Sequence, residues 1–415
     1  MSMGRKKRLI AGIDLGTTKI CVVVAAADGP GLRVLGSGTV PSTGLRKGVV
    51  VNLSETIDSI RAALELAEER SKTVVESAYV SLGSAYLRGV NRCGTTEVRG
   101  RNNEITLEDI QRAVAAAREM EIAEGYEVIH VLTQKFKVDG QDGIEDPKGM
   151  HGHELSVNLH LVVTASSVLQ NIVNAVNKAG VMADGVVMQQ LASAESILSD
   201  DEKELGVFLV DIGGGTTDLA VYSQGAIWHS EVFPLGGNLI TKDIAIGTKA
   251  LISEAEQVKK EVGSVFPESV PVEEVVEITE VGSGRQKTIQ RQFVCRIIQA
   301  RCDELLNRVA RITQAVGVNN ELATGVVLTG GGAMLDGFRD RAETILRMPV
   351  RIGYPVNLVA QDHEIYHPAF CTALGLLRYA HELRNGVPSA RAKPVYGRSK
   401  GRTDRMKRWL LETIS

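Results

Sequence analysis

Two segments of the chain share one pattern, in which apolar runs flank a polar turn rich in glycine and threonine. The first turn lies between the apolar runs 9–12 and 21–27, and the second lies between 206–210 and 219–222. Short apolar runs bounded by Gly and Asp are typical of buried strands, so each segment predicts a β-hairpin. The turns carry Asp14, Gly16, Thr17, Thr18 and Lys19 in the first hairpin, and Asp211, Gly213, Gly214, Gly215, Thr216, Thr217 and Asp218 in the second. The repeat indicates an internal duplication.

A third glycine turn follows the apolar run 326–329 and precedes a helical pattern over 335–347. It consists of Gly330, Gly331, Gly332 and Ala333. Glycines let backbone N–H groups approach phosphate oxygens, threonine hydroxyls add donors, and an aspartate that ends a strand can hold the waters of Mg²⁺. One such turn alone would equally fit a tight hairpin without a ligand. Three turns in this order predict a nucleotide held between two related lobes.

The rest of the pattern alternates strands with helices and predicts an α/β fold. Strands are expected over 9–14, 19–25, 32–40 and 78–82, with a helix over 52–70 that is capped by Ser54. A further helix over 189–198 directly precedes the second hairpin. Gln190 at its start could position an attacking water, or its amide could bond to backbone, and the sequence does not separate these roles.

Residues 84–166 predict a compact α+β insert. Strands are expected over 86–97, 127–138 and 156–164, and a helix is expected over 106–119 behind a Thr106 cap. His151, His153 and Glu154 could bind a metal, but no further ligand follows at a recognisable spacing. A solvated loop is therefore the favoured interpretation of this segment.

A second insert is predicted over 237–308, with helices over 235–245, 248–261 and 295–316 and a hairpin over 275–294. Gly236, Gly237 and Asn238 open its first helix. Glu256 and Lys259 lie three residues apart, on one helix face, where they could contact a ribose and an adenine. Their spacing alone favours an exposed ion pair.

The two ends of the chain differ in charge from the middle. Residues 391–415 contain eight Lys and Arg against Asp404 and Glu412, a balance of +6 within a chain of net charge −3. Residues 385–402 predict a flexible linker, and 403–415 predict a short amphipathic helix. The residues expected at a membrane surface are Arg405, Met406, Lys407, Arg408, Trp409, Leu410, Leu411 and Ile414. Basic side chains and Trp favour an anionic bilayer over docking on the protein itself.

Composition narrows the classes of function. The 415 residues supply ample apolar material for two or more domains, but aromatic residues make up only 4%. This scarcity argues against a stacking surface for nucleic acid, which is therefore not an expected partner. The five cysteines are scattered without CxxC pairs, as in a reduced cytoplasmic protein. The apolar runs are strand-sized, so the expected membrane contact is peripheral.

These motifs resemble the phosphate-1, phosphate-2 and adenosine motifs of the superfamily that contains actin, DnaK-type chaperones and sugar kinases. Within it, the chain most resembles the FtsA family of bacterial cell-division proteins over nearly its whole length. The resemblance implies an actin-like two-lobed ATPase fold with duplicated β-β-β-α-β-α units, a small α+β insert in the first lobe and a C-terminal amphipathic helix. The implied first lobe comprises 1–83, 167–205 and 366–384, with the insert at 84–166. The implied second lobe comprises 206–236 and 309–365, with a subdomain at 237–308, a linker at 385–402 and a membrane helix at 403–415.

The resemblance also implies function and site residues. It implies an ATP-binding protein that polymerises at the cytoplasmic face of the membrane at the division site. There it would bind the C-terminal peptide of FtsZ through 237–308, and later division proteins through 84–166. Asp14 and Asp211 would order Mg²⁺ through water, and the two hairpin turns would hold phosphates. Glu256 and Lys259 would face the adenosine, and Gly330 to Gly332 would let it approach the backbone. Gln190 would stand where the chaperones of the superfamily carry a stronger base. ATP binding is therefore the safer expectation, and hydrolysis is expected to be slow, polymer-dependent or absent.

Three other classes share this fold. A related pilus-assembly adaptor is the nearest alternative, and a sugar kinase would need a substrate pocket with a catalytic aspartate that the sequence does not suggest. A DnaK-type chaperone would need a peptide-binding domain after about residue 385, where only some 30 residues remain.

Overall fold

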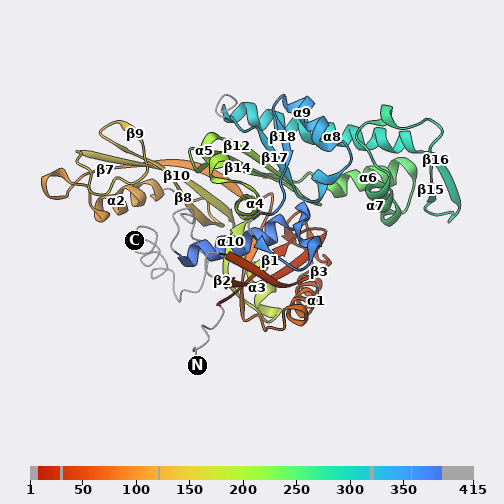
Figure 1. Ribbon diagram of the computed structural model, residues 1–415, viewed down its shortest axis with the longest axis horizontal. Helices are drawn as coiled ribbons and strands as arrows, with labels where there is room; N and C mark the ends of the chain where they lie inside the picture. Colours follow the sequence, from red (N-terminus) through yellow and green to blue (C-terminus); the bar gives the residue numbers. More distant parts are fainter. Residues whose placement is uncertain (1–7, 29–30, 120–121, 318–321, 357, 386–415) are drawn as a thin grey trace.

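The computed structural model describes residues 8–28, 31–119, 122–317, 322–356 and 358–385. Two sheets form its framework (Figure 1). The first has the order β11-β6-β1-β2-β3-β19. Its strands are β1 (Arg8–Leu15), β2 (Lys19–Asp28), β3 (Gly31–Pro41), β6 (Ser77–Leu82), β11 (Met182–Met188) and β19 (Leu358–Val359). A small ribbon of β4 (Leu45–Arg46) and β5 (Val49–Val50) follows β3.

The second sheet repeats the strand order of the first. It contains β18 (Val350–Ile352), β17 (Val326–Thr329), β12 (Val207–Ile212), β13 (Thr217–Ser223) and β14 (Ala226–Phe233). In both sheets the hairpin strands are antiparallel, and the first strand of each hairpin pairs in parallel with a later strand. This equivalence confirms the predicted duplication.

The insert extends the second sheet. Its strands β7 (Arg88–Glu97), β8 (Tyr126–Val138), β9 (Gln141–Ile144) and β10 (Glu154–Ala165) follow β14 in the strand order. The backbone pairing between β7 and β14 is limited to Arg88 and Glu231. Side chains complete the seam: Gln134 Nε2 donates to the Ile227 carbonyl at 2.9 Å, and His160 Nε2 lies 2.8 Å from Ser230 Oγ. The helix α2 (Leu107–Arg118) covers the insert, behind the predicted Thr106 cap.

Helices cover and separate the sheets. The first sheet packs against α1 (Leu53–Ser71), with α3 (Ser166–Lys178) beside α1. The helices α4 (Gln189–Ile197) and α10 (Cys371–Asn385) pack closely against each other where the two sheets meet (Figure 1). The other side of the second sheet carries α8 (Arg291–Val316) and α9 (Phe338–Leu346), followed by α6 (Gly237–Thr248), α7 (Ile252–Glu261) and the hairpin of β15 (Val275–Thr279) and β16 (Gln286–Gln290). Short elements are α5 (Asp200–Leu205), η1 (Arg101–Asn103), η2 (Pro267–Ser269), η3 (Gly331–Met334), η4 (His363–Tyr366) and η5 (Pro368–Phe370).

Strand β12 shows why the central runs are continuously apolar. Val207 and Leu209 belong to the core that contains α4 and α10, whereas Phe208 and Val210 belong to the core under α8. Alternate side chains of one strand thus enter two cores, and a strand that is covered on both faces needs apolar residues at every position. The insert has a third, smaller core.

Several predicted boundaries are wrong by a few residues. The cap of α1 is Asn52 rather than Ser54, since Asn52 Oδ1 accepts from the Glu55 N–H at 3.3 Å. The helix predicted over 248–261 begins at Ile252, and α8 begins at Arg291, within the segment predicted as a strand. The predicted linker began at residue 385, but Asn385 is the last residue of α10. The rest of the predicted linker and the predicted amphipathic helix lie outside the described residues. Among the helices of the described part, none is both long and apolar enough to cross a membrane.

Candidate functional site

The two predicted hairpin turns lie against each other. A Cβ atom on Gly214 would lie 1.8 Å from Thr18 Oγ1, and one on Gly215 would lie 2.5 Å from Thr17 Oγ1. Only glycine therefore fits at these two positions. The turns between β1 and β2 and between β12 and β13, which are far apart in the sequence, are thereby in direct contact.

The start of α6 joins the two turns. The N–H groups of Gly237 and Asn238 donate to the carbonyls of Gly213 and Gly214, at 3.0 and 2.8 Å. Thr18 Oγ1 donates to Asn238 Oδ1 at 3.4 Å, and a Cβ on Gly236 would lie 2.6 Å from the Gly213 carbonyl oxygen. Asn238 thus contacts both turns, and the predicted Gly236, Gly237 and Asn238 lie at the site.

Three aspartates enter this region from three strands. Asp14 is the last residue but one of β1, whereas Asp211 and Asp218 face each other as register partners of β12 and β13. Ser81 Oγ donates to Asp14 Oδ1 at 2.8 Å, Ser193 Oγ to Asp211 Oδ2 at 2.6 Å, and Thr216 Oγ1 to Asp218 Oδ2 at 2.9 Å. All three carboxyl groups are buried.

Burial changes the acidity of these groups. Desolvation raises the pKa of Asp14 and raises that of Asp211 to about 6. Burial and then the nearby Asp211 charge raise the pKa of Asp218 well above its usual range. Buried like charges that raise each other's pKa values are costly without a cation. The site therefore favours a cationic partner such as Mg²⁺.

Lys19 supplies a cation that has no hydrogen-bond acceptor. Its Nζ atom is buried, with no hydrogen-bond partner among the described residues, and lies 3.4 Å from the centroid of the Phe370 ring. Asp218 Oδ1 is a second buried polar atom without a partner in this part of the chain. An ammonium donor, a carboxylate acceptor and glycine turns with no room for a Cβ fit a phosphate and its metal ion.

The two glutamines that begin α4 have different surroundings. Gln190 is fully buried, and neither of its amide atoms has a hydrogen-bond partner among the described residues. Gln189 instead donates through Nε2 to Asp14 Oδ1 and lies equally close to Ser81 Oγ, both at 3.3 Å. Gln189 rather than Gln190 therefore faces the aspartates. The apolar period of α4 did not reveal this, because both glutamines precede its first apolar residue.

The third glycine turn lies beside Asp211. Gly330 has φ +82°, and a Cβ there would lie 2.4 Å from Asp211 Oδ1. A Cβ on Gly332 would lie 2.4 Å from Ile212 Cγ2, and Ala333 is buried. Gly331 is more open, since its nearest contact, Ala369 Cβ, would be 3.8 Å away. The third turn thus packs directly on the strand that carries Asp211.

Glu256 and Lys259 form a partly buried cluster rather than an exposed pair. Lys259 Nζ lies 2.6 Å from Glu256 Oε2 and donates to the Gly237 carbonyl at 3.2 Å. Thr241 Oγ1 also donates to Glu256. Lys259 therefore reaches the α6 residues that contact the two hairpin turns. Burial lowers its pKa despite the carboxylate partner.

The sequence did not point to residues 367–372, which contact all three turns. Phe370 contacts Lys19, and Thr372 Oγ1 donates to Asp211 Oδ2 at 3.3 Å. Thr329 Oγ1 donates to the Pro368 carbonyl at 3.4 Å. The segment has no glycine pattern, and only its tertiary contacts identify it.

No group of three or more His, Cys, Asp or Glu side chains within the described residues is placed to hold a metal directly. His151 is exposed, and its Nδ1 lies 3.2 Å from the Asn102 carbonyl. Residues 149–153 lie outside the longer strands, whereas Glu154 begins β10.

Comparisons with known proteins identify the family. Residues 208–375 match the family model described as cell division protein FtsA, and 84–163 match the SHS2 domain inserted in FtsA. The chain is 35% identical to the cell division protein FtsA of Pseudomonas aeruginosa, over 99% of both chains. It is 36% identical to that of Bacillus subtilis, over 90% of this chain and 83% of the relative.

Solved structures share the fold at low sequence identity. The PilM–PilN type IV pilus biogenesis complex gives a TM-score of 0.63 at 15% identity, covering 89% of this chain and 97% of the other. MreB5 of Spiroplasma citri bound to ADP gives 0.55 at 15% identity, covering 92% and 98%. The predicted fold, actin-like with an α+β insert, is thus confirmed. The chain belongs to the FtsA family of bacterial cell-division proteins.

Proposed function

We propose that this protein binds ATP with Mg²⁺ between the two hairpin turns. The observation that carries this proposal is the contact of Gly214 and Gly215 with Thr18 and Thr17, next to the unpartnered Lys19 Nζ. Backbone N–H groups of both turns, the threonine hydroxyls and the Lys19 ammonium would bind phosphate oxygens. Asp14 and Asp211 would hold the waters of Mg²⁺, and Glu256 and Lys259 would contact the adenosine.

Hydrolysis, where it occurs, is expected to be slow or dependent on polymerisation. Bound Mg²⁺ would supply charge neutralisation for the terminal phosphate. Gln189 would orient a water molecule toward that phosphate, since its amide is held by Asp14 and Ser81. An amide orients water but is a poor base, so Gln189 supplies positioning without proton abstraction.

The second part of the proposal concerns the FtsZ C-terminal peptide and the subdomain 237–308. Large apolar side chains are exposed there, at Ile246, Leu251, Ile252, Val272, Val275, Val281 and Phe293. Several of them come together, because the Val281 N–H donates to the Lys249 carbonyl at 2.8 Å. This brings the end of the β15 strand to the junction of α6 and α7, where Ile246, Leu251 and Ile252 lie. A cluster of exposed apolar residues is typical of a peptide-binding surface.

The third part concerns the membrane and the filament. The basic amphipathic segment 403–415 would anchor the protein peripherally to anionic lipid at the cytoplasmic face of the division site. Self-association into filaments and the binding of later division proteins by the 84–166 insert follow from the family resemblance. The domain boundaries given by that resemblance are proposed with it. A pilus-assembly adaptor and a sugar kinase are disfavoured, because the curated relatives at 35 and 36% identity are division proteins.

Electron microscopy on an anionic lipid monolayer tests the proposal as a whole. The full chain with Mg-ATP should form filaments on the monolayer and then retain added FtsZ. Deletion of 404–415 should abolish both the filaments on the monolayer and the retention of FtsZ, and undiminished binding would contradict the membrane role.

The Ile252→Glu variant should still form filaments on the monolayer but should no longer retain FtsZ. A matched control is Val359→Glu, which changes a similarly exposed apolar residue, 65% against 68%, on β19 of the first sheet. Equal FtsZ retention by the two variants would argue against the apolar surface.

A further inference from the structure

The Lys19 side chain has an unusual environment for a buried cation. Its Nζ atom has no hydrogen-bond acceptor among the described residues, although Asp14 and Asp211 lie close enough to influence it electrostatically. Its close neighbour is the Phe370 ring, with Nζ 3.4 Å from the ring centroid. An ammonium over an aromatic face is attracted by the negative face of the ring. This contact therefore holds Lys19 without using an acceptor.

Phe370 is itself held in place by its neighbours. It ends η5, where the Phe370 N–H donates to the His367 carbonyl at 2.9 Å. Two residues before it, the Pro368 carbonyl accepts a hydrogen bond from Thr329 Oγ1, and the Cys371 carbonyl accepts one from Ser196 Oγ at 2.8 Å. The ring also packs against the core that contains α4 and α10. The backbone on both sides of Phe370 is thus fixed before any ligand binds.

We propose that Phe370 is a positioning residue for Lys19, which it holds ready to bind the terminal phosphates of the nucleotide. This inference rests on the proposed ATP site. The ring faces one side of the ammonium, and the remaining N–H donors stay available for phosphate oxygens. A side chain fixed in its bound position loses less entropy when the ligand arrives, which strengthens binding. AMP lacks the terminal phosphates, so its affinity does not depend on Phe370.

Calorimetric titration with Mg-ATP, Mg-ADP and AMP tests the proposal. Phe370→Leu keeps an apolar side chain but removes the aromatic face. This variant should lower the affinity for ATP and for ADP by about 3- to 30-fold. AMP affinity should change by less than about twofold. Phe370→Tyr keeps the ring and should restore the affinity for ATP and ADP. Phe266→Leu, between α7 and η2, is the matched control, since Phe266 is partly buried like Phe370 but packs against the core under α8, and it should leave all three affinities unchanged.

A double-mutant cycle with Lys19→Met isolates the pairwise contact. In the Lys19→Met background, Phe370→Leu should cause no further loss of ATP affinity. Thermal unfolding without nucleotide verifies that each variant is folded, and Phe370→Tyr keeps the test decisive if Phe370→Leu does not fold. The inference fails if the Phe370→Leu variant binds ATP as tightly as the wild type does, or if it loses as much affinity for AMP as for ATP. It also fails if Phe370→Leu lowers the ATP affinity by the same factor in the Lys19→Met background. A wild-type protein that does not bind ATP would instead overturn the proposed site itself.

Discussion

Ser193 Oγ donates a hydrogen bond of 2.6 Å to Asp211 Oδ2, so the helix that follows the first sheet holds a carboxylate of the second sheet. Thr372 adds a second hydroxyl donor at 3.3 Å. These two donors lower the pKa of Asp211, yet desolvation outweighs them and raises it to about 6. The carboxylate is therefore arranged for a ligand at a cost to the stability of the folded protein.

Asp211→Asn should increase the stability of the nucleotide-free protein near pH 7.5. Because the folded-state pKa is raised to about 6 from 3.8, the folded protein binds this proton more tightly than the unfolded chain does. The wild type therefore loses stability as the pH rises from about 4 to 6, and asparagine mimics the protonated side chain. The gain should be about 1–3 kcal/mol above pH 7 and should vanish near pH 4, as measured by urea unfolding.

The same variant should bind Mg-ATP at least about tenfold more weakly, since it lacks the charge that is proposed to hold the hydrated metal. Titration calorimetry with Mg²⁺ and with EDTA measures this effect. The difference between variant and wild type should disappear in EDTA. Unchanged affinity with Mg²⁺ would mean that the metal role of Asp211 is misassigned.

Lys259→Met should weaken the binding of ATP, ADP and AMP equally, by about tenfold, since it removes the charged contact that is proposed on the adenosine side. This pattern differs from the one expected for Lys19, which distinguishes nucleotides by their terminal phosphates. Lys260→Met is the matched control, because Lys260 also pairs with Glu256, at 3.1 Å, but is 64% exposed. Fluorescence competition with the three nucleotides separates the variants, and equal behaviour of Lys259→Met and Lys260→Met would contradict the assignment.

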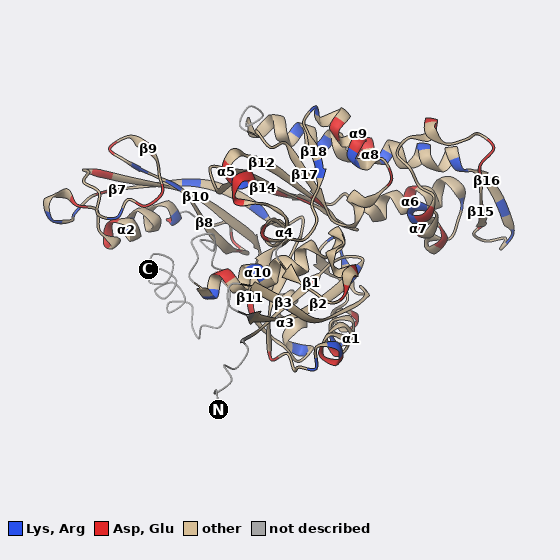
Figure 2. Ribbon diagram, viewed as in Figure 1, with Lys and Arg blue, Asp and Glu red and all other residues tan. Residues whose placement is uncertain are grey.

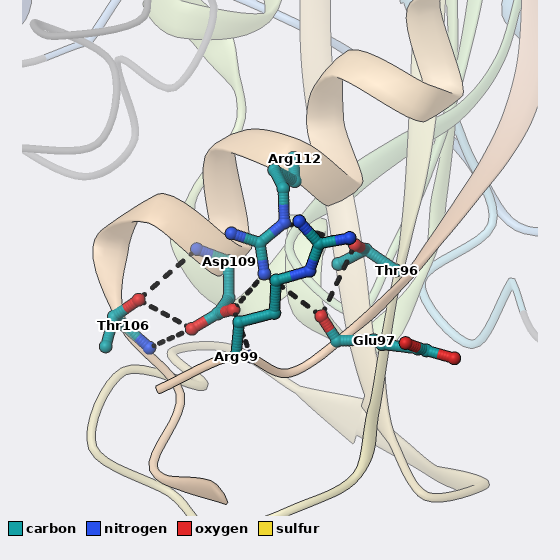
Figure 3. A network of polar contacts seen from close by, with 6 residues as sticks. All are labelled: Thr96, Glu97, Arg99, Thr106, Asp109 and Arg112. Atoms are coloured by element: carbon teal, nitrogen blue, oxygen red, sulfur yellow. Dashed lines mark hydrogen bonds and ion pairs between the residues drawn. The ribbon is translucent and has the colours of Figure 1, made fainter. Parts of the chain in front are cut away.

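Asp109→Asn should loosen the insert without changing nucleotide affinity. Asp109 accepts hydrogen bonds from the N–H groups of Arg99 and Thr106, both at 2.8 Å, and pairs with Arg112 (Figure 3). These bonds outweigh its burial and lower its pKa to about 2. The stabilisation is therefore present above about pH 4 and is lost as the pH falls toward 2.

The loss for Asp109→Asn should be about 1.5–3 kcal/mol, localised to α2 and measured by amide hydrogen exchange. Asp142→Asn in the same insert is the control, since Asp142 is 63% exposed in its pair with Lys137 and should contribute little. If the backbone amides of α2 exchanged at the same rate in both variants, the network in Figure 3 would not stabilise the helix.

Trp409→Glu should release the full chain from anionic vesicles, because it places a charge on the face predicted to contact acyl chains. Co-sedimentation with vesicles rich in phosphatidylserine measures the bound fraction. Glu412→Gln serves as a control, since it changes a charge on the opposite face and should maintain or strengthen binding. Retention of Trp409→Glu at the wild-type level would refute the proposed orientation.

The sequence predicted the parts of the site that depend on local chemistry. The turns around Gly16, Gly214 and Gly330 were recognisable because their glycine and threonine residues are required by the backbone conformation and the close packing of each turn itself. Ser193 and Thr372 were not recognisable, since each acts on Asp211 across 18 and 161 positions of the chain. A serine within a helix carries no sign of its distant partner.

Strand order was predictable from the duplication, but the position of the insert was not. Its chain connections place it between β6 and α3, whereas its strands continue from β14 of the second sheet. The seam depends on Gln134 and His160, whose polar side chains look like ordinary strand residues in the sequence. The choice between Gln189 and Gln190 was equally hidden, because it depends on the exact starting angle of α4.

Charge is distributed mainly over the outer elements. Figure 2 shows Lys, Arg, Asp and Glu on α1, α7, α8 and the hairpin of β15 and β16, with few charged residues around β1, β2 and α4. The aspartates of the site are buried away from these outer charges, and their burial is the main reason why their pKa values rise.

The packing of α4 against α10 limits how the two sheets can move. A Cβ on Gly375 would lie 1.7 Å from the Ala192 carbonyl oxygen, so the helices touch backbone to backbone at this point. Such close contact resists sliding of one helix along the other but permits a change in their crossing angle. α10, about 22 Å long for its 15 residues, therefore cannot slide along α4 without first separating from it at this contact.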